Sequence, residues 1–330
     1  SEPMKMSDKL APVTTPEMPY EEYLSIVGSL LHICNVTRSD CMFAVGFLAR
    51  HGSRPSLNHF EAAKNVVAFL YNTRHRCIQY VRDASMAHGR VPYAYLDLPN
   101  RLRMFVDADF AGTVASARST SGRVSFMNQG VVSAKSQLQK LVALSTSEAE
   151  TIALCESIKD ALSLKLLCEE LCLRPESELL PIHEDNVSCR EMAMSDKAYD
   201  KARHFRTRVA FNQYHCRGED KTMNLLLTPT HLMVADGYTK ALEGQSFMNF
   251  MEWVTSASFF DNSSQPVHAQ VSERAGEQKS RSAQPVSQSA PALTGSLIDR
   301  LRDGTVFGGR GTTDTQSTVQ VLLASNASSK

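Results

Sequence analysis

The chain has 330 residues, of which 42% are hydrophobic and 21% are charged. This length corresponds to roughly two domains of ~150 residues with a substantial buried core, which excludes a disulfide-stabilised miniprotein. Lys and Arg together number 35, as do Asp and Glu, so the overall charge gives no indication of a polyanionic partner. Any contact with nucleic acid must therefore come from local basic patches.

The cysteines and the apolar segments indicate in which part of the cell the protein is expected. The eight cysteines are spread singly, without a C-x-x-C pair or a Cys/His cluster at metal-binding spacing. We therefore expect reduced cysteines and an intracellular protein, of the cytoplasm or the nucleus. No window approaches the ~18 uncharged apolar residues that a membrane helix needs, so no membrane partner is expected.

The first part of the chain is expected to be helical after a disordered N-terminal segment at residues 1–19. Apolar side chains then recur at helical spacing in three segments, Tyr20–Cys34, Ser39–Arg50 and Ser56–Asn72. Two short strand-like segments follow them, at residues 77–81 and 92–96. We interpret residues 20–97 as a small helical unit.

Residues 98–254 have a pattern typical of an α/β domain. Strands are predicted at Leu102–Asp107, Gly122–Met127, Val131–Ala134, Leu179–Glu184 and Met223–Leu227. A long helix at Ser147–Leu173 separates the third strand from the fourth, and the domain ends with a single helix at residues 234–251. This order predicts a sheet of mixed strand directions flanked by helices. Residues 255–330, rich in Ser, Gln, Ala, Gly and Pro, are expected to form a disordered tail.

Four acidic residues are predicted at the ends of strands or the starts of helices. They are Asp107, Glu150, Asp185 and Asp236. Sites in open α/β sheets form at the carboxyl ends of strands, and carboxylates suit a hard cation such as Mg²⁺. Two such ions ~3.5–4 Å apart can activate a water and stabilise the leaving oxygen of a phosphodiester. The alternative is structural, because acids at helix starts and strand ends are ordinary dipole and turn residues.

The start of the long helix contains two glutamates with different predicted roles. Ser145-x-x-Glu148 is a capping box, in which Glu148 turns back onto the helix end. Glu150 lies about 200° further around the helix and points elsewhere. This leaves Glu150 free to bind a metal.

A basic stretch follows the fourth strand. Its members are Lys197, Lys201, Arg203, Arg206 and Arg208. Beside Asp185, such a stretch suits contact with the phosphates of a nucleic-acid duplex. The alternative is a solvated helix start in which Tyr199 and Phe205 turn toward the core.

Several motifs of the chain match one family in the same order. They are Asp107-Ala-Asp-Phe-Ala-Gly, Arg118-Ser-Thr-Ser-Gly, Ala143-Leu-Ser-Thr-Ser-Glu-Ala-Glu, Asp185-Asn and Ala235-Asp-Gly-Tyr-Thr-Lys-Ala-Leu. With these motifs the chain closely resembles the C-terminal part of copia-type retrotransposon Pol polyproteins, the end of the reverse transcriptase followed by ribonuclease H. Residues 20–97 resemble the thumb or connection segment of the reverse transcriptase.

The resemblance implies a ribonuclease H-like fold and an endonuclease. It would hydrolyse the RNA strand of RNA/DNA hybrids by two-metal-ion catalysis with Mg²⁺ or Mn²⁺, held by Asp107, Glu150, Asp185 and Asp236. Its partners would be the hybrid and the reverse transcriptase portion of the same polyprotein. His231 would then occupy a loop where ribonuclease H relatives often carry a histidine that helps proton transfer or product release, unless it is simply polar surface.

Some residues depart from the family pattern. Gly237 stands where a large apolar residue is usual, Glu184 where a cysteine is usual, and Arg206 where an acid is usual. These departures favour the alternative of a catalytically decayed module from a degenerate element, which binds nucleic acid or another partner. The aromatic-x-Asp-Asp signature of the polymerase is absent, because Ala108 separates the two acids of Phe105-Val-Asp-Ala-Asp.

Overall fold

The computed structural model describes residues 19–81, 100–113, 116–173, 178–195 and 205–257. The first of these ranges begins with helices α1 (Tyr20–Val36), α2 (Met42–Arg50) and α3 (Leu57–Asn72), with a short 3₁₀ helix, η1 (Ser39–Cys41), before α2. These three helices coincide with the three segments in which the apolar periodicity predicts a helix. A two-residue strand, β1 (Arg76–Cys77), then pairs with β7 (Ser256–Ala257). The predicted strand at residues 92–96, and most of both termini, lie outside the described residues.

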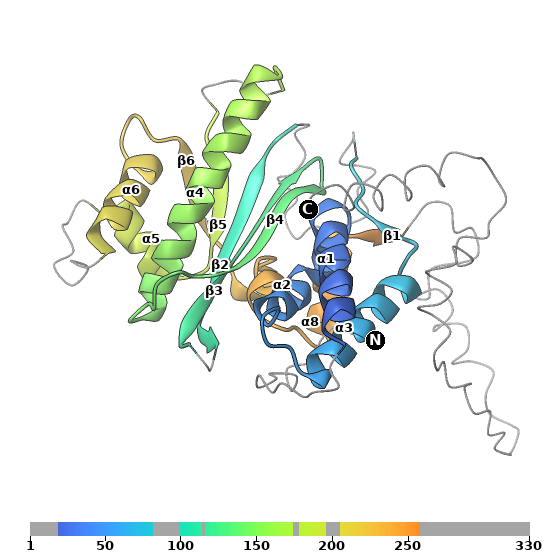
Figure 1. The fold of residues 1–330 in the computed structure, drawn as a ribbon. Coiled ribbons are helices and arrows are strands. Elements are labelled where there is room, and N and C mark those ends of the chain that lie inside the picture. The colour runs from blue at the N-terminus through green and yellow to red at the C-terminus, as the bar shows by residue number, and fades with distance from the viewer. Residues whose placement is uncertain (1–18, 82–99, 114–115, 174–177, 196–204, 258–330) are drawn as a thin grey trace, which may run out of the picture. The chain divides into compact units, whose positions relative to one another are not determined.

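The part of the chain that follows is built on a five-stranded mixed sheet (Figure 1). Its strands are β2 (Arg103–Thr113), β3 (Arg118–Met127), β4 (Gly130–Leu138), β5 (Leu180–Glu184) and β6 (Met223–Leu227), in the spatial order β4-β3-β2-β5-β6. Strands β2, β3 and β4 are antiparallel, whereas β5 and β6 run parallel to β2. This arrangement confirms the predicted α/β class with a mixed sheet.

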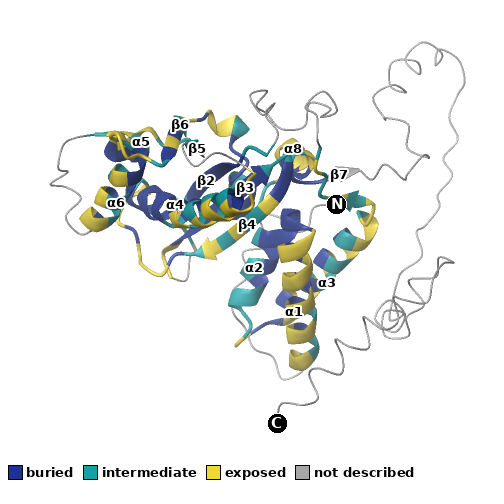
Figure 2. Ribbon diagram, turned by 90° about the horizontal axis from the view of Figure 1, so that it is seen from above, coloured by how far each residue is buried: buried dark blue, intermediate teal, exposed yellow. Residues whose placement is uncertain are grey.

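Side chains alternate between two hydrophobic cores on the two faces of β2. Met104 and Val106 pack against α4 (Thr146–Glu170), together with residues of α5 (Val187–Met194) and α6 (Arg206–Cys216). Phe105, between them in sequence, belongs to the other core, which the helical unit shares with the C-terminal helices. Figure 2 shows the buried strands between these helices. The helical unit therefore packs directly on the sheet face opposite α4.

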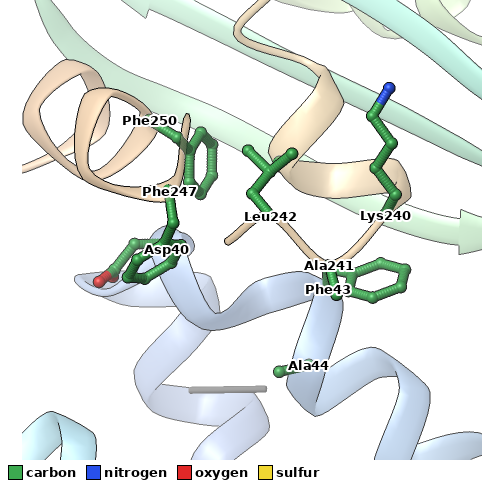
Figure 3. Close-up of a pocket in the computed structure, with 9 residues that line it drawn as sticks. Asp40, Phe43, Ala44, Lys240, Ala241, Leu242, Phe247 and Phe250 are labelled. Carbon is green, nitrogen blue, oxygen red and sulfur yellow. The ribbon is translucent and has the colours of Figure 1, made fainter. Parts of the chain in front are cut away.

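The predicted helix at residues 234–251 is wrong in one respect, because the structure has two helices there. They are α7 (Asp236–Thr239) and α8 (Gly244–Val254), preceded by a short 3₁₀ helix, η5 (Thr230–Leu232). Lys240 is extended, with φ −142° and ψ 159°, and Gly244 has a positive φ of 57°. The break turns α8 back so that Phe247 and Phe250 face a small pocket beside Phe43 of α2 (Figure 3). None of the described helices combines the length and the apolar character required to cross a membrane.

Candidate metal centre

Carboxylates from three elements meet where the pairing between β2 and β5 ends. The last paired residues of these parallel strands are Phe105 and His183, and Asp107 and Asp185 each lie two residues further on. Glu150 enters from α4. One side-chain oxygen from each of the three acids lies within 4.8 Å of the other two. Asp107 and Glu150 are buried, and Asp185 is half-buried.

Asp236, the first residue of α7, lies beside this group. It falls outside the set of three within 4.8 Å, but its carboxyl is within hydrogen-bonding reach of Asp107. Its Oδ2 pairs with the ammonium of Lys240 at 2.9 Å, and its Oδ1 is buried without a hydrogen-bond partner. The hydroxyl of Thr239 donates to Oδ2 of Asp107. Helix α7 therefore supplies an acid and also holds Asp107 in place.

The two glutamates at the start of α4 take different positions. The backbone N–H of Glu148 donates to Oγ of Ser145 at 3.1 Å, which confirms the predicted helix cap. The carboxylate of Glu148 accepts from the N–H of Leu144 at 2.8 Å, one residue before the backbone group that a standard capping box would use. Glu150 instead accepts a hydrogen bond from the backbone of Ala108 on β2.

Glu184 is an additional acid beside the site that the sequence singled out only as a departure from the family. It is fully buried, its Oε1 accepts from the N–H of Asn186 at 3.1 Å, and its Oε2 has no hydrogen-bond partner. Strand alternation puts Glu184 on the same face as Ile182, which packs in the α4 core. That alternation was the available signal for its burial, but it carries no information about its proximity to Glu150.

The site brings several acidic side chains together where little water reaches them. Burial, followed by the charges of Glu184 and Asp107, raises the pKa of Glu150 well above its usual value. Burial also raises the pKa of Glu184, and burial followed by the charge of Asp107 raises that of Asp236 to about 7. One oxygen each of Glu150, Glu184 and Asp236 is buried without a hydrogen-bond partner. An all-oxygen donor set with such unpaired oxygens fits a hard divalent cation such as Mg²⁺ or Mn²⁺.

These shifts predict that the metal-free protein loses stability as the pH rises from 7 to 8. An acid with a raised pKa keeps its proton in the folded state while the unfolded chain has lost it, so raising the pH favours unfolding. We expect the free energy of unfolding in EDTA to fall by up to about 1.4 kcal/mol for each buried carboxyl that stays protonated through this range, and by less for Asp236, which loses most of its contribution below its pKa of about 7. The buried His59 and His183, with pKa values lowered to about 4 and about 3, act in the opposite sense but mainly below pH 6.5.

Urea denaturation at pH 7, 7.5 and 8 measures this dependence. Mg²⁺ requires the deprotonated carboxylates, so adding it should flatten the slope or reverse it. A free energy of unfolding that rises with pH in EDTA would contradict the electrostatic description of the site.

The predicted nucleic-acid contacts are only partly described. Lys197, Lys201 and Arg203 lie outside the described residues, whereas Arg206 and Arg208 stand in the first turn of α6, where Arg206 is exposed. Phe205, before that helix, is buried. His231 is exposed on η5, next to Thr230, whose hydroxyl bonds Asp185.

Comparisons with known proteins connect this chain to retrotransposons. It is 31% identical over 250 residues to the retrovirus-related Pol polyprotein from transposon TNT 1-94 of Nicotiana tabacum, a match that covers 74% of this chain and 17% of that protein. It is 26% identical over 251 residues to the retrovirus-related Pol polyprotein from transposon RE2 of Arabidopsis thaliana, a match that covers 75% of this chain and 16% of that protein. The chain therefore spans about one sixth of these polyproteins. No protein-family model matches it.

Two further similarities involve shorter proteins. The secreted RxLR effector protein 161 of Plasmopara viticola is 37% identical over 142 residues, a match that covers 43% of this chain and 90% of that protein. Among solved structures, the chain is similar to LC11-RNase H1, isolated from compost by a metagenomic approach, with a TM-score of 0.31 and 14% identity. That match covers 42% of this chain and 93% of that one.

Proposed function

The chain belongs to the Pol polyproteins of copia-type retrotransposons, and from this premise we propose that its sheet domain is a metal-dependent endonuclease of the ribonuclease H type. The observation that carries the proposal is the meeting of Asp107, Glu150 and Asp185, with oxygens within 4.8 Å of one another. The unpaired oxygens of Glu150 and Asp236 support it, because a merely structural acid is normally hydrogen-bonded when buried.

Asp107, Glu150 and Asp185 would hold Mg²⁺ or Mn²⁺, with Asp236 at the edge of the group. When bound, such ions activate a water and stabilise the leaving oxygen of a phosphodiester. The protein keeps the carboxylates in place: Thr239 fixes Asp107, and the backbone of Ala108 fixes Glu150. Such preorganisation is what a site of this kind requires.

The proposed substrate is the RNA strand of an RNA/DNA hybrid, and the proposed partner is the reverse transcriptase portion of the same polyprotein. A choice of RNA over DNA requires contacts to the 2′-hydroxyl across the minor groove. Arg206 and Arg208, with the rest of the basic stretch, would contact phosphates, so binding should weaken as salt rises.

Incubation of the purified chain with an RNA/DNA hybrid labelled on the RNA strand tests the proposal. We expect cleavage in Mg²⁺ or Mn²⁺, no cleavage in EDTA, and little cleavage of duplex DNA. The Asp107→Asn variant, purified in parallel, should be inactive and thus excludes a contaminating nuclease. A chain that binds the hybrid in a salt-dependent way but never cuts it would be the decayed binding module instead.

A further inference from the structure

Arg50, the last residue of α2, carries a charge that no acid among the described residues neutralises. Its Nη1 donates a long hydrogen bond of 3.4 Å to Oγ1 of Thr120 on β3. Its Nη2 is buried and donates no hydrogen bond. The ion pairs among the described residues do not include Arg50. Burial also lowers the pKa of Arg50, as expected for a cation that loses water without gaining an anion.

The register of the sheet places this guanidinium on the same face as the Asp107 carboxylate. Thr120 stands opposite Asp109, and Gly122 stands opposite Asp107. Thr120, which Arg50 contacts, is therefore a diagonal cross-strand neighbour of Asp107 on the same face of the sheet, about 7–8 Å away. Helix α2 contacts both β4 and α7, which fixes Arg50 relative to the site.

A half-buried, unpaired arginine at such a position indicates a missing anionic partner. Leaving a desolvated charge unpaired is unfavourable, and in a native structure the usual explanation is an absent ligand, ion or water. The guanidinium matches the geometry of phosphate oxygens. Successive phosphates of one strand are about 3.4 Å apart along a duplex axis, so a separation of about 7 Å is within reach of a neighbouring phosphate.

We propose that Arg50 contacts a backbone phosphate of the bound nucleic acid next to the cleavage position, so that the helical unit forms part of the substrate-binding surface. This inference rests on the proposed nuclease function, and it adds a contact from outside the sheet domain. Arg50 is thus a positioning residue for the substrate, and Thr120 orients it.

Hybrid binding by the full chain tests the contact. Fluorescence anisotropy with a labelled RNA/DNA hybrid in EDTA, over a range of salt concentrations, measures affinity without cleavage. We expect Arg50→Gln to weaken binding roughly tenfold and to reduce the slope of log K against log salt by about one, as for loss of one phosphate contact. Arg54→Gln, a matched change at an exposed arginine four residues away, should leave affinity within about twofold.

Thermal melting separates this role from a structural one. Arg50→Gln removes an unpaired charge, so its melting temperature should equal or exceed that of the wild type, and Arg50→Lys should keep part of the affinity. Equal binding by wild type and Arg50→Gln would overturn the contact and leave the nuclease proposal standing. A melting temperature lowered in Arg50→Gln, with no affinity recovered in Arg50→Lys, would also overturn it. A wild-type chain that binds no hybrid would overturn both proposals.

Discussion

Replacing Glu150 with Gln is expected to reduce cleavage of the hybrid at least about 10³-fold while stabilising the metal-free protein. Loss of a ligand should cost several kcal/mol of transition-state stabilisation, and about 4 kcal/mol corresponds to this factor. The amide oxygen can still accept from the backbone of Ala108, and the new NH₂ group can donate to the neighbouring carboxylates. Gln does not ionise, so folding no longer has to protonate this buried position beside Glu184 and Asp107, and the free energy of unfolding at pH 7 should therefore rise by roughly 1 kcal/mol or more.

The same substitution at Glu148 provides the control. Glu148 lies two residues before Glu150 on α4. Its carboxylate accepts a hydrogen bond from the N–H of Leu144 and lies near the positive end of the helix dipole. We expect Glu148→Gln to lower stability by about 0.3–1 kcal/mol and to leave cleavage within about tenfold of wild type. Hybrid cleavage in Mg²⁺ and urea denaturation in EDTA measure both effects. If Glu148→Gln abolished cleavage and Glu150→Gln kept it, the roles of the two residues would be reversed.

The separation of these two glutamates shows what the sequence predicts well. Helical periodicity is local, so the different directions of Glu148 and Glu150 follow from the 3.6-residue repeat alone. The sequence predicts that Asp107 meets Asp185 only if β2 and β5 are neighbours. Local patterns do not establish this, because the pairing of these strands joins residues almost 80 positions apart.

The features that the sequence did not reveal are contacts across long separations. The bond from Arg50 to Thr120 joins α2 to β3, and no local pattern at either residue indicates it. The proximity of Glu184 to Glu150 likewise depends on how α4 packs against β5. The two helices at residues 234–251 were predicted as one because the apolar spacing continues through the break at Lys240.

This break explains how the protein tolerates Gly237. A Cβ added at Gly237 would overlap three ring carbons of Phe250. The ring is almost fully buried, and it packs edge-on against Tyr238 with ring centroids 5.1 Å apart. Figure 3 shows Phe250 and Phe247 on α8, facing the pocket that Gly237 helps to line. Phe250 thus occupies the space of a side chain at position 237 and braces the helix that carries Asp236.

Gly237→Leu is therefore expected to destabilise the protein by about 1–3 kcal/mol through overpacking, and Phe250→Ala by about 3–5 kcal/mol through the cavity it leaves. In the double variant the new leucine can fill the space of the removed ring, so the loss should be smaller than the sum of the single losses by at least about 1 kcal/mol. Urea denaturation of the four proteins measures this coupling. Gly28→Leu is the control, because Gly28 is exposed on α1 and has nothing within 4 Å of an added Cβ, so this substitution should be neutral or stabilising. Single effects that add to within about 0.5 kcal/mol would mean that Phe250 does not take the place of a side chain at position 237.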